Sequence, residues 1–298
     1  MKKTFLSVLA VVMALSVSAR ELEVVSIDRV PTQTLSEMAT ISPDGTFAVV
    51  GSMGGGALYR VDLASGESSK ITSNGNANAL AISPDGQNVV FRAVSNKGKL
   101  RYNSLEQVNL ATGKQTQLVK PSRNLATGLA ISNDGVSAVQ NGRLQAKKLG
   151  AAKAAVRPVA TINYGHLDIT TADGRTTTID PQGRGSYLWP TISPDGTKVA
   201  YCLAGAGAFV ANIDGSNARQ LGYMHAPQWM GNDMIIGMQD HGSDQVLTDS
   251  KIVACDLQGK FQTLTPADMV AIYPTVSADG SKILFSDIQG NLYTISVK

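Results

Sequence analysis

Three histidines and the carboxylates near two of them are the residues of this sequence best suited to chemistry. His225 and His241 lie close in the sequence to Asp240 and Asp244, whereas His166 stands apart. Imidazole and carboxylate groups bind metal ions and transfer protons, so this set would suit metal-assisted or acid–base chemistry. Their spacing follows no fixed ligand pattern, and a polar surface loop explains them adequately. The sequence therefore predicts no metal site, no cofactor and no catalytic residue.

A run of positive charge occupies residues 140–164, which contain five basic residues and no acidic one. The five are Arg143, Lys147, Lys148, Lys153 and Arg157. On a body that is otherwise slightly acidic, such a block can engage an acidic partner, an anionic glycan or lipid head groups. The alternative is a solvated hairpin whose lysines maintain solubility. We treat the five as candidate partner-binding residues and their segment as an insertion.

Aromatic residues make up only 5% of the chain, so their clustering is informative. Five of them stand just before or within short β-rich segments of the C-terminal half: Tyr187, Trp189, Tyr223, Trp229 and Tyr273. Gathered at one place, these rings would form a patch that binds a peptide or a sugar. For Trp189 and Trp229 individually, packing in the core is the competing interpretation.

A repeated motif reveals the elements that must position these side chains. Ile-Ser-Pro-Asp-Gly occurs at 41–45, 82–86 and 192–196, with variants at 131–135 and 276–280 and an eroded copy at 229–233. Successive copies are 41, 49, 61, 37 and 47 residues apart. Such a period is typical of propeller blades, and six units of this size leave no room for a second domain.

Each unit reads as four short antiparallel strands. An apolar run leads into Ser-Pro-Asp-Gly, where Pro and Gly favour a tight turn, and a β-rich run such as 198–201 returns from it. Residues 58–72 show the third and fourth runs, which are separated by another Gly turn. The sequence therefore predicts an all-β, six-bladed β-propeller of four-stranded antiparallel blades. The blades are expected to start near residues 38, 79, 128, 189, 226 and 273.

Ring closure makes a separate demand on the ends of the chain. The last unit, 273–298, supplies only three strands, while a strand-like segment at 21–30 precedes the first unit. We expect this segment to pair with 291–297, which completes the last blade and removes exposed sheet edges.

The aspartates of the repeated motif are spread around the ring, one in each unit. Each is expected to cap its own turn rather than to share a site with the others. They are Asp44, Asp85, Asp134, Asp195 and Asp279.

The repeats resemble the WD-like propeller repeats of the periplasmic translocation protein family TolB, and this resemblance is best seen over 190–201 and 211–221. It covers essentially the whole chain after residue 20 and implies a propeller. TolB-like proteins carry a further domain ahead of the propeller, and only about twenty residues precede the first repeat here. Related repeats occur in prolyl-oligopeptidase-type peptidases, but the Gly-x-Ser-x-Gly motif of their hydrolase domain is absent from this sequence.

Charge and cysteine content narrow the possible partners and chemistry. Without Lys2 and Lys3 the chain has 24 basic and 23 acidic residues, so it lacks the positive field that non-specific nucleic-acid binding requires. No nucleic-acid partner is therefore expected. Cys202 and Cys255 both lie in apolar runs, and we favour two buried, unpaired thiols over a disulfide.

Residues 1–19 have the pattern of a cleavable secretory signal peptide, with two lysines, an apolar run and small residues before the expected cut. No later segment is long and apolar enough to cross a bilayer, and no cysteine follows the cut to carry a lipid. We expect a periplasmic or secreted protein whose mature part is 20–298.

Together these features favour a non-catalytic binding or scaffolding protein for a protein, peptide or glycan of the cell envelope. The alternative is a propeller enzyme, such as a lyase, lactonase or glycan hydrolase, with its site at the mouth of the channel. The sequence predicts neither the partner nor the oligomeric state.

Overall fold

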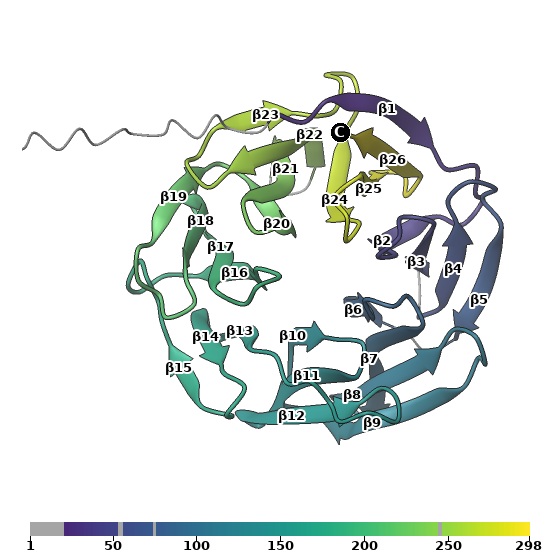
Figure 1. Ribbon diagram of the computed structural model, residues 1–298, viewed down its shortest axis with the longest axis vertical. Helices are drawn as coiled ribbons and strands as arrows, with labels where there is room; N and C mark the ends of the chain where they lie inside the picture. Colours follow the sequence, from purple (N-terminus) through teal and green to yellow (C-terminus); the bar gives the residue numbers. More distant parts are fainter. Residues whose placement is uncertain (1–20, 53–55, 74–75, 244–245) are drawn as a thin grey trace, which may run out of the picture.

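The computed structural model describes residues 21–52, 56–73, 76–243 and 246–298, and the expected signal segment lies outside these ranges. The chain forms seven antiparallel sheets arranged around one axis, each contributing one inner strand to the central ring (Figure 1). Within the described ranges, no helix is long and apolar enough to cross a membrane. The protein is thus an all-β propeller as predicted, but the prediction of six blades is wrong: it has seven.

Five blades contain four strands, and each blade is described from the axis outward. Blade 1 consists of β2 (Ser36–Ile41), β3 (Phe47–Ser52), β4 (Leu58–Asp62) and β5 (Ser68–Thr72). Blade 2 consists of β6 (Asn76–Ile82), β7 (Asn88–Lys97), β8 (Leu100–Asn109) and β9 (Gln115–Ser122). Blade 5 consists of β16 (Tyr187–Ile192), β17 (Lys198–Leu203), β18 (Gly207–Asn212) and β19 (Arg219–Gly222). Blade 6 consists of β20 (His225–Met230), β21 (Met234–Ser243), β22 (Val246–Asp256) and β23 (Phe261–Thr263). Blade 7 consists of β24 (Ala271–Val276), β25 (Lys282–Asp287), β26 (Leu292–Val297) and β1 (Val24–Arg29).

The Ser-Pro-Asp-Gly turns join the first strand of a blade to the second. In the first copy, Ser42 Oγ donates a hydrogen bond to Asp44 Oδ1 at 2.6 Å, and Asp44 Oδ1 also accepts the backbone N–H of Thr46 at 3.1 Å. The same two bonds recur at Asp195 and Asp279. Asp85 accepts the corresponding bonds from Ser83 Oγ and from the backbone N–H of Gln87. Four of the five aspartates therefore cap their own turns, as predicted. At the fifth turn of the described chain Ser132 Oγ donates to Gly135 O instead, so the prediction is wrong for Asp134. We call the face that carries the turns the lower face and the opposite face the upper face.

Two neighbouring blades have only three strands each in the described chain. Blade 3 consists of β10 (Leu125–Ile131), β11 (Gly135–Gln140) and β12 (Arg143–Lys148). Blade 4 consists of β13 (Val159–Asn163), β14 (His166–Thr170) and β15 (Thr176–Thr178). The predicted insertion at 140–164 does not exist, because these residues form the outer strand of blade 3 and the inner strand of blade 4. The 61-residue interval between motif copies thus holds two blades rather than one.

The number of strands in a blade decides on which face the chain leaves it. Four strands return the chain to the upper face, whereas the three strands of blade 3 leave it on the lower face. Arg157, just before β13, donates a side-chain hydrogen bond to Pro194 O in the lower turn of blade 5. Gly165 O, just after β13, accepts the backbone N–H of Tyr187 at 3.0 Å, at the upper start of β16. The inner strand of blade 4 therefore runs opposite to the other six, and a second three-stranded blade restores the original direction.

The N-terminal strand closes the ring, as the sequence predicts. β1 pairs antiparallel with β26 in a register that runs from Val24 opposite Val297 to Arg29 opposite Tyr293. Beyond the strand end, Glu23 and Lys298 exchange two backbone hydrogen bonds of 3.0 Å. Figure 1 shows β1 as the outermost strand of the last blade, beside the C-terminal strand. The two ends of the described chain are thus held in one sheet.

Buried side chains fill the spaces between blades. Cys202 and Cys255 belong to the cluster between blades 5 and 6, and both thiols are free. Burial raises the pKa of each thiol to about 12, which keeps it protonated at neutral pH. The two cysteines act as small hydrophobic residues, as the sequence favours.

Candidate functional site

Two long hairpins rise from the upper face on nearly opposite sides of the ring (Figure 1). The blade-2 hairpin is formed by β7 and β8, with 10 residues each, and the blade-6 hairpin by β21 and β22, with 10 and 11. The corresponding second strands of the other four-stranded blades have six residues. At about 3.3 Å per residue, the extra length carries each hairpin roughly 13 Å further. A partner approaching this face meets the hairpins first.

Four aromatic rings form a continuous row between blades 5 and 6. Trp189 and Tyr223 flank His225, each with a ring-centroid distance of 5.0 Å, and Tyr223 stacks on His241 at 5.6 Å. Offset or tilted contacts at these distances are favourable for aromatic pairs. We call these four residues the ring row. Because Trp189 and Tyr223 keep 41% and 46% of their surface exposed, the row can still receive a ligand.

A carboxylate holds one imidazole of the ring row, and another lies near the second. His225 Nδ1 lies 2.8 Å from Asp240 Oδ1, and His241 Nδ1 lies 3.6 Å from Asp249 Oδ2. The hydroxyl of Tyr223 donates a 2.6 Å hydrogen bond to the backbone oxygen of Asp240. The structure thus brings together three of the four residues named for the enzyme alternative, while Asp244 lies outside the described residues. In the described part of the chain, no group of three or more His, Cys, Asp or Glu side chains is placed to hold a metal ion.

The other aromatic candidates divide between surface and core. Tyr273 is 37% exposed and faces the channel, whereas Tyr187 is completely buried and contacts Tyr201 at a centroid distance of 5.4 Å. Trp229 packs against the core between blades 5 and 6, and its indole Nε1–H donates to Thr191 O at 3.0 Å. Packing therefore accounts for Tyr187 and Trp229, and the exposed rings are those of Trp189, Tyr223 and Tyr273.

Three inner strands place a non-glycine residue in the left-handed region of φ. Trp189, Ala226 and Tyr273 have φ values of +46°, +48° and +53°, and each precedes a proline. This conformation is uncommon for residues with a side chain, and a following proline restricts it further. Each lies at an irregularity in strand pairing, at the same level of blades 5, 6 and 7. Such strain is concentrated at functional sites, and here it accompanies two rings that line the channel.

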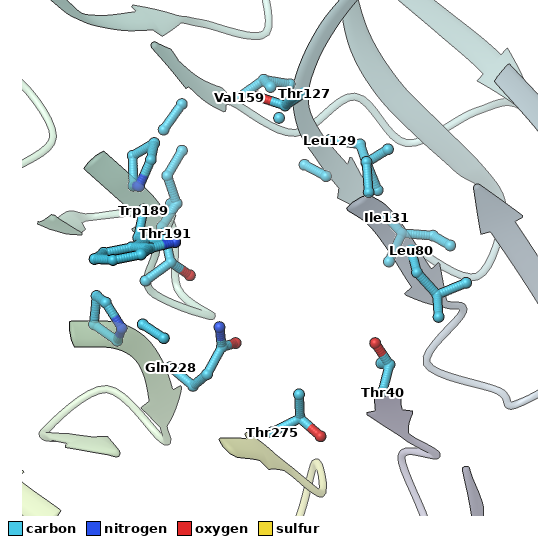
Figure 2. Close-up of a pocket in the computed structure, with 18 of the residues that line it drawn as sticks. Thr40, Leu80, Thr127, Leu129, Ile131, Val159, Trp189, Thr191, Gln228 and Thr275 are labelled. Atoms are coloured by element: carbon cyan, nitrogen blue, oxygen red, sulfur yellow. The ribbon is translucent and has the colours of Figure 1, made fainter. Parts of the chain in front are cut away.

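The channel along the axis has a volume of about 560 Å³ and two unlike sides. Figure 2 shows Leu80, Leu129 and Ile131 on the side opposite Thr191 and Gln228. The side-chain amide of Gln228 has no hydrogen-bond partner among the described residues, although it lies in the lining of the channel. The channel therefore offers an apolar wall and, opposite it, the side-chain amide of Gln228 to whatever enters from the upper face.

The five basic candidates do not form one site. Arg143 begins β12 on the upper face, whereas Lys147 and Lys148 end the same strand near the lower face. Lys153 follows in the connection to blade 4, and Arg157 lines the lower part of the channel. Only Arg143 thus shares a face with the exposed rings.

One exposed aromatic residue on the upper face was not singled out by the sequence. Tyr164 stands at the tip of the β13–β14 hairpin, is 99% exposed and has a φ of +50°. Gly165 follows with a φ of +85°, so the two form a tight hairpin turn in which both central residues have positive φ. The signal for it in the sequence was Asn163-Tyr164-Gly165 between two β-rich runs.

Comparisons with known proteins agree with this architecture. No protein-family model and no curated protein matches the chain. A protein assigned as TolB from Agrobacterium tumefaciens has a TM-score of 0.56 and 19% identity, covering 91% of this chain and 96% of its own. A chain of the mitotic checkpoint complex has a TM-score of 0.59 and 13% identity, covering 99% and 98%. At such identities the likeness concerns the fold, which is that of a TolB-like β-propeller.

Proposed function

We propose that this chain is a non-catalytic binding protein of the cell envelope that contacts a protein, peptide or glycan through its upper face. The leader pattern of residues 1–19 supports export to the periplasm or beyond. The TolB-like fold is compatible with such a role but does not specify it. The argument for binding therefore rests on the surface.

The distribution of exposed apolar side chains carries this proposal. Of the eleven large hydrophobic side chains that are exposed in the described ranges, eight lie on or near the upper face. They are Leu35, Leu100, Tyr164, Leu188, Trp189, Tyr223, Tyr273 and Ile288. Apolar and aromatic side chains gathered on one face and surrounded by polar groups are typical of an interaction surface. The lower face, in contrast, consists largely of self-capped turns.

Site-specific photo-cross-linking in the native host tests the face. We expect a benzoylphenylalanine residue at Tyr164 or Tyr223 to give a discrete adduct after irradiation, because both side chains are exposed on the upper face. Val156 is also exposed but lies next to the lower end of β13, so it provides the matched control. Adducts from Val156 alone, or from none of the three positions, would refute the proposal.

The enzyme alternative is supported by one observation, the pairing of Asp240 with His225 at the mouth of the channel. An aspartate that orients an imidazole is a common arrangement for proton transfer. Among the described residues, no serine, threonine or cysteine side chain has a hydrogen bond to this pair. The thiol of Cys202 interacts electrostatically with Asp240, but burial, together with that charge, raises its pKa to about 12, and it donates to Met224 O. Turnover of a polysaccharide or lactone by the wild-type protein, lost in His225→Ala, would establish this alternative.

A further inference from the structure

The block at 140–164 is part of a much longer stretch in which positive charge is concentrated. Residues 86–167 contain twelve Lys or Arg and two Asp or Glu. The rest of the chain from residue 20 onward contains twelve basic and 21 acidic residues. A nearly neutral protein therefore has a strongly basic sector, formed by blades 2 and 3, and an acidic remainder.

Six exposed cations of this sector meet on the upper face, and we call them the basic arc. They are Lys97, Lys99 and Arg101 at the tip of the blade-2 hairpin, Lys120 and Arg123 beside the β9–β10 connection, and Arg143 at the start of β12. None of the six forms an ion pair with any described residue. Glu106, the only acidic residue of blade 2 after its lower turn, is buried and accepts hydrogen bonds from Ser104 and Gln117. The positive charge of the arc is therefore not neutralised within the fold.

Neutral hydrogen bonds hold the loops of the basic arc in place. The Asn124 side chain donates to Asn141 Oδ1 at 3.0 Å, and Asn141 N–H donates to Asn124 O at 2.9 Å. The Gln140 side chain donates to Lys120 O at 3.1 Å. These bonds join the β9–β10 connection of blade 2 to the β11–β12 turn of blade 3 without using a carboxylate. The loops that carry Lys120, Arg123 and Arg143 are thus fixed to one another, which lowers the entropy lost when a ligand binds there.

We infer that the basic arc binds the acidic groups of an anionic polysaccharide whose chain continues across the channel mouth to the ring row. This inference rests on the proposed function, since it names the ligand class of the same face. Arginine and lysine side chains recognise carboxylate, sulfate or phosphate groups. Trp189 and Tyr223 offer exposed aromatic surface for sugar rings. On the same side of the channel, the Gln228 amide, which has no hydrogen-bond partner among the described residues, can bind a hydroxyl group.

Two other anionic partners fit this face less well. A flat anionic membrane would meet both long hairpins at once, and the blade-6 hairpin carries Asp240 and Asp249. A folded acidic protein needs a continuous apolar centre to bury, whereas here the channel opens between the basic arc and the ring row. An extended charged chain avoids both difficulties.

Titration calorimetry of the purified protein with alginate oligosaccharides, with neutral maltodextrins of equal length as the comparison, tests the inference. We expect alginate to bind and maltodextrin not to. The triple variant Lys97→Glu, Lys99→Glu, Arg101→Glu is expected to weaken alginate binding by at least about tenfold at low salt, because attraction becomes repulsion. Raising the salt concentration should weaken binding to the wild type.

A second triple variant provides a control with the same change in net charge. Lys147→Glu, Lys148→Glu, Lys153→Glu alters side chains near the lower face, and we expect it to change alginate affinity less than about threefold. Equal losses in both triple variants would overturn the inference, and so would tight binding of maltodextrin. Equal or tighter binding of polyglutamate or of phosphatidylglycerol vesicles would also overturn it, in favour of an acidic polypeptide or a membrane.

The outcome can be separated from that of the proposed function. If alginate does not bind but Tyr164 and Tyr223 still cross-link to a partner, the upper face is a binding surface and only the polysaccharide is wrong. If neither experiment gives a signal, both the inference and the proposed function fail.

Discussion

The two long hairpins of the upper face are alike in length and opposite in how their charges are satisfied. On the blade-6 hairpin, Asp240 lies 2.8 Å from His225, and Asp249 lies 3.8 Å from Lys251. On the blade-2 hairpin, the three cations at the tip have no carboxylate partner among the described residues. Both of these carboxylates of the first hairpin thus have partners within the fold. The second leaves its charges to solvent or to a ligand.

The root of the blade-2 hairpin shows the same lack of partners. Arg92 Nε is buried and has no hydrogen-bond partner in the described chain. Burial, together with the nearby charge of Arg101, lowers the pKa of the Arg92 guanidinium. Repulsion between Arg92 and Arg101 does not stabilise the fold. Length alone therefore does not mark a functional hairpin, whereas unsatisfied charge does.

The largest expected difference between the two regions is in stability. His225→Ala removes the ring between Trp189 and Tyr223 and the partner of Asp240, so we expect it to lower the free energy of unfolding by about 2–3 kcal/mol. Arg101→Ala, on the opposite hairpin, is expected to change it by less than about 0.5 kcal/mol. Urea unfolding followed by circular dichroism measures both. Equal changes in the free energy of unfolding would show that the two regions contribute equally to the stability of the fold.

The architecture could be predicted where the chain repeats a turn. Six of the seven inner strands end at a copy of the Ser-Pro-Asp-Gly motif or at one of its variants, because a reversal at the lower face favours turn residues such as Pro, Asn, Asp and Gly. The inner strand of blade 4 ends instead at the upper face, so its turn is Tyr164-Gly165. Counting one motif per blade therefore missed this blade.

A local signal for the missing blade was nevertheless present. Asn141-Gly142 joins β11 to β12 with φ values of +51° and +70°. Asn-Gly between two β-rich runs strongly indicates a hairpin, and it lies inside the segment predicted to be an insertion. The spacing of the long-range motif therefore hides a blade that the local Asn-Gly turn indicates.

The candidate site was only partly predictable, for a geometric reason. The sequence groups five aromatic residues, but a one-residue difference within a strand separates the buried Tyr187 from the neighbouring exposed positions, and the grouping does not reveal this. The basic arc draws on three connections that are more than forty residues apart at their extremes, from Lys97 to Arg143. Only the arrangement of blades 2 and 3 brings these connections to one face.

The turn aspartates of the lower face are further charges that have partners within the fold. Their contribution to stability can be tested by lowering the pH. The side-chain hydroxyls of Ser42 and Ser193 lower the pKa values of Asp44 and Asp195. For Asp279, backbone and serine hydrogen bonds do the same. Because these pKa values are lower in the folded state, the stabilisation is present above about pH 4 and is lost as pH falls through the folded values.

We therefore expect Asp195→Asn to be less stable than the wild type at pH 6 and to lose less stability between pH 6 and pH 3. Melting temperatures across this range measure the effect. Lys99→Gln is the control from the basic arc, since its side chain has no hydrogen bond to a turn carboxylate in the described structure. If the melting temperature of Asp195→Asn fell between pH 6 and pH 3 as much as that of the wild type, the turn aspartate would not contribute to the pH dependence of stability.

The smallest expected effects are the most specific, because the two hairpins should respond with opposite signs. Arg101→Gln removes a charge that repels the Arg92 guanidinium, so we expect it to raise the free energy of unfolding slightly, by roughly a few tenths of a kcal/mol, at low salt. Lys251→Gln removes the ion pair with Asp249 and should lower the same quantity by a similar amount. Both differences should shrink towards zero at about 0.5 M NaCl, where exposed charges are screened. Urea unfolding midpoints at the two salt concentrations measure both changes. A loss of stability in both variants would mean that the cations of the blade-2 hairpin have partners within the fold. They would then be no more available to a ligand than those of blade 6.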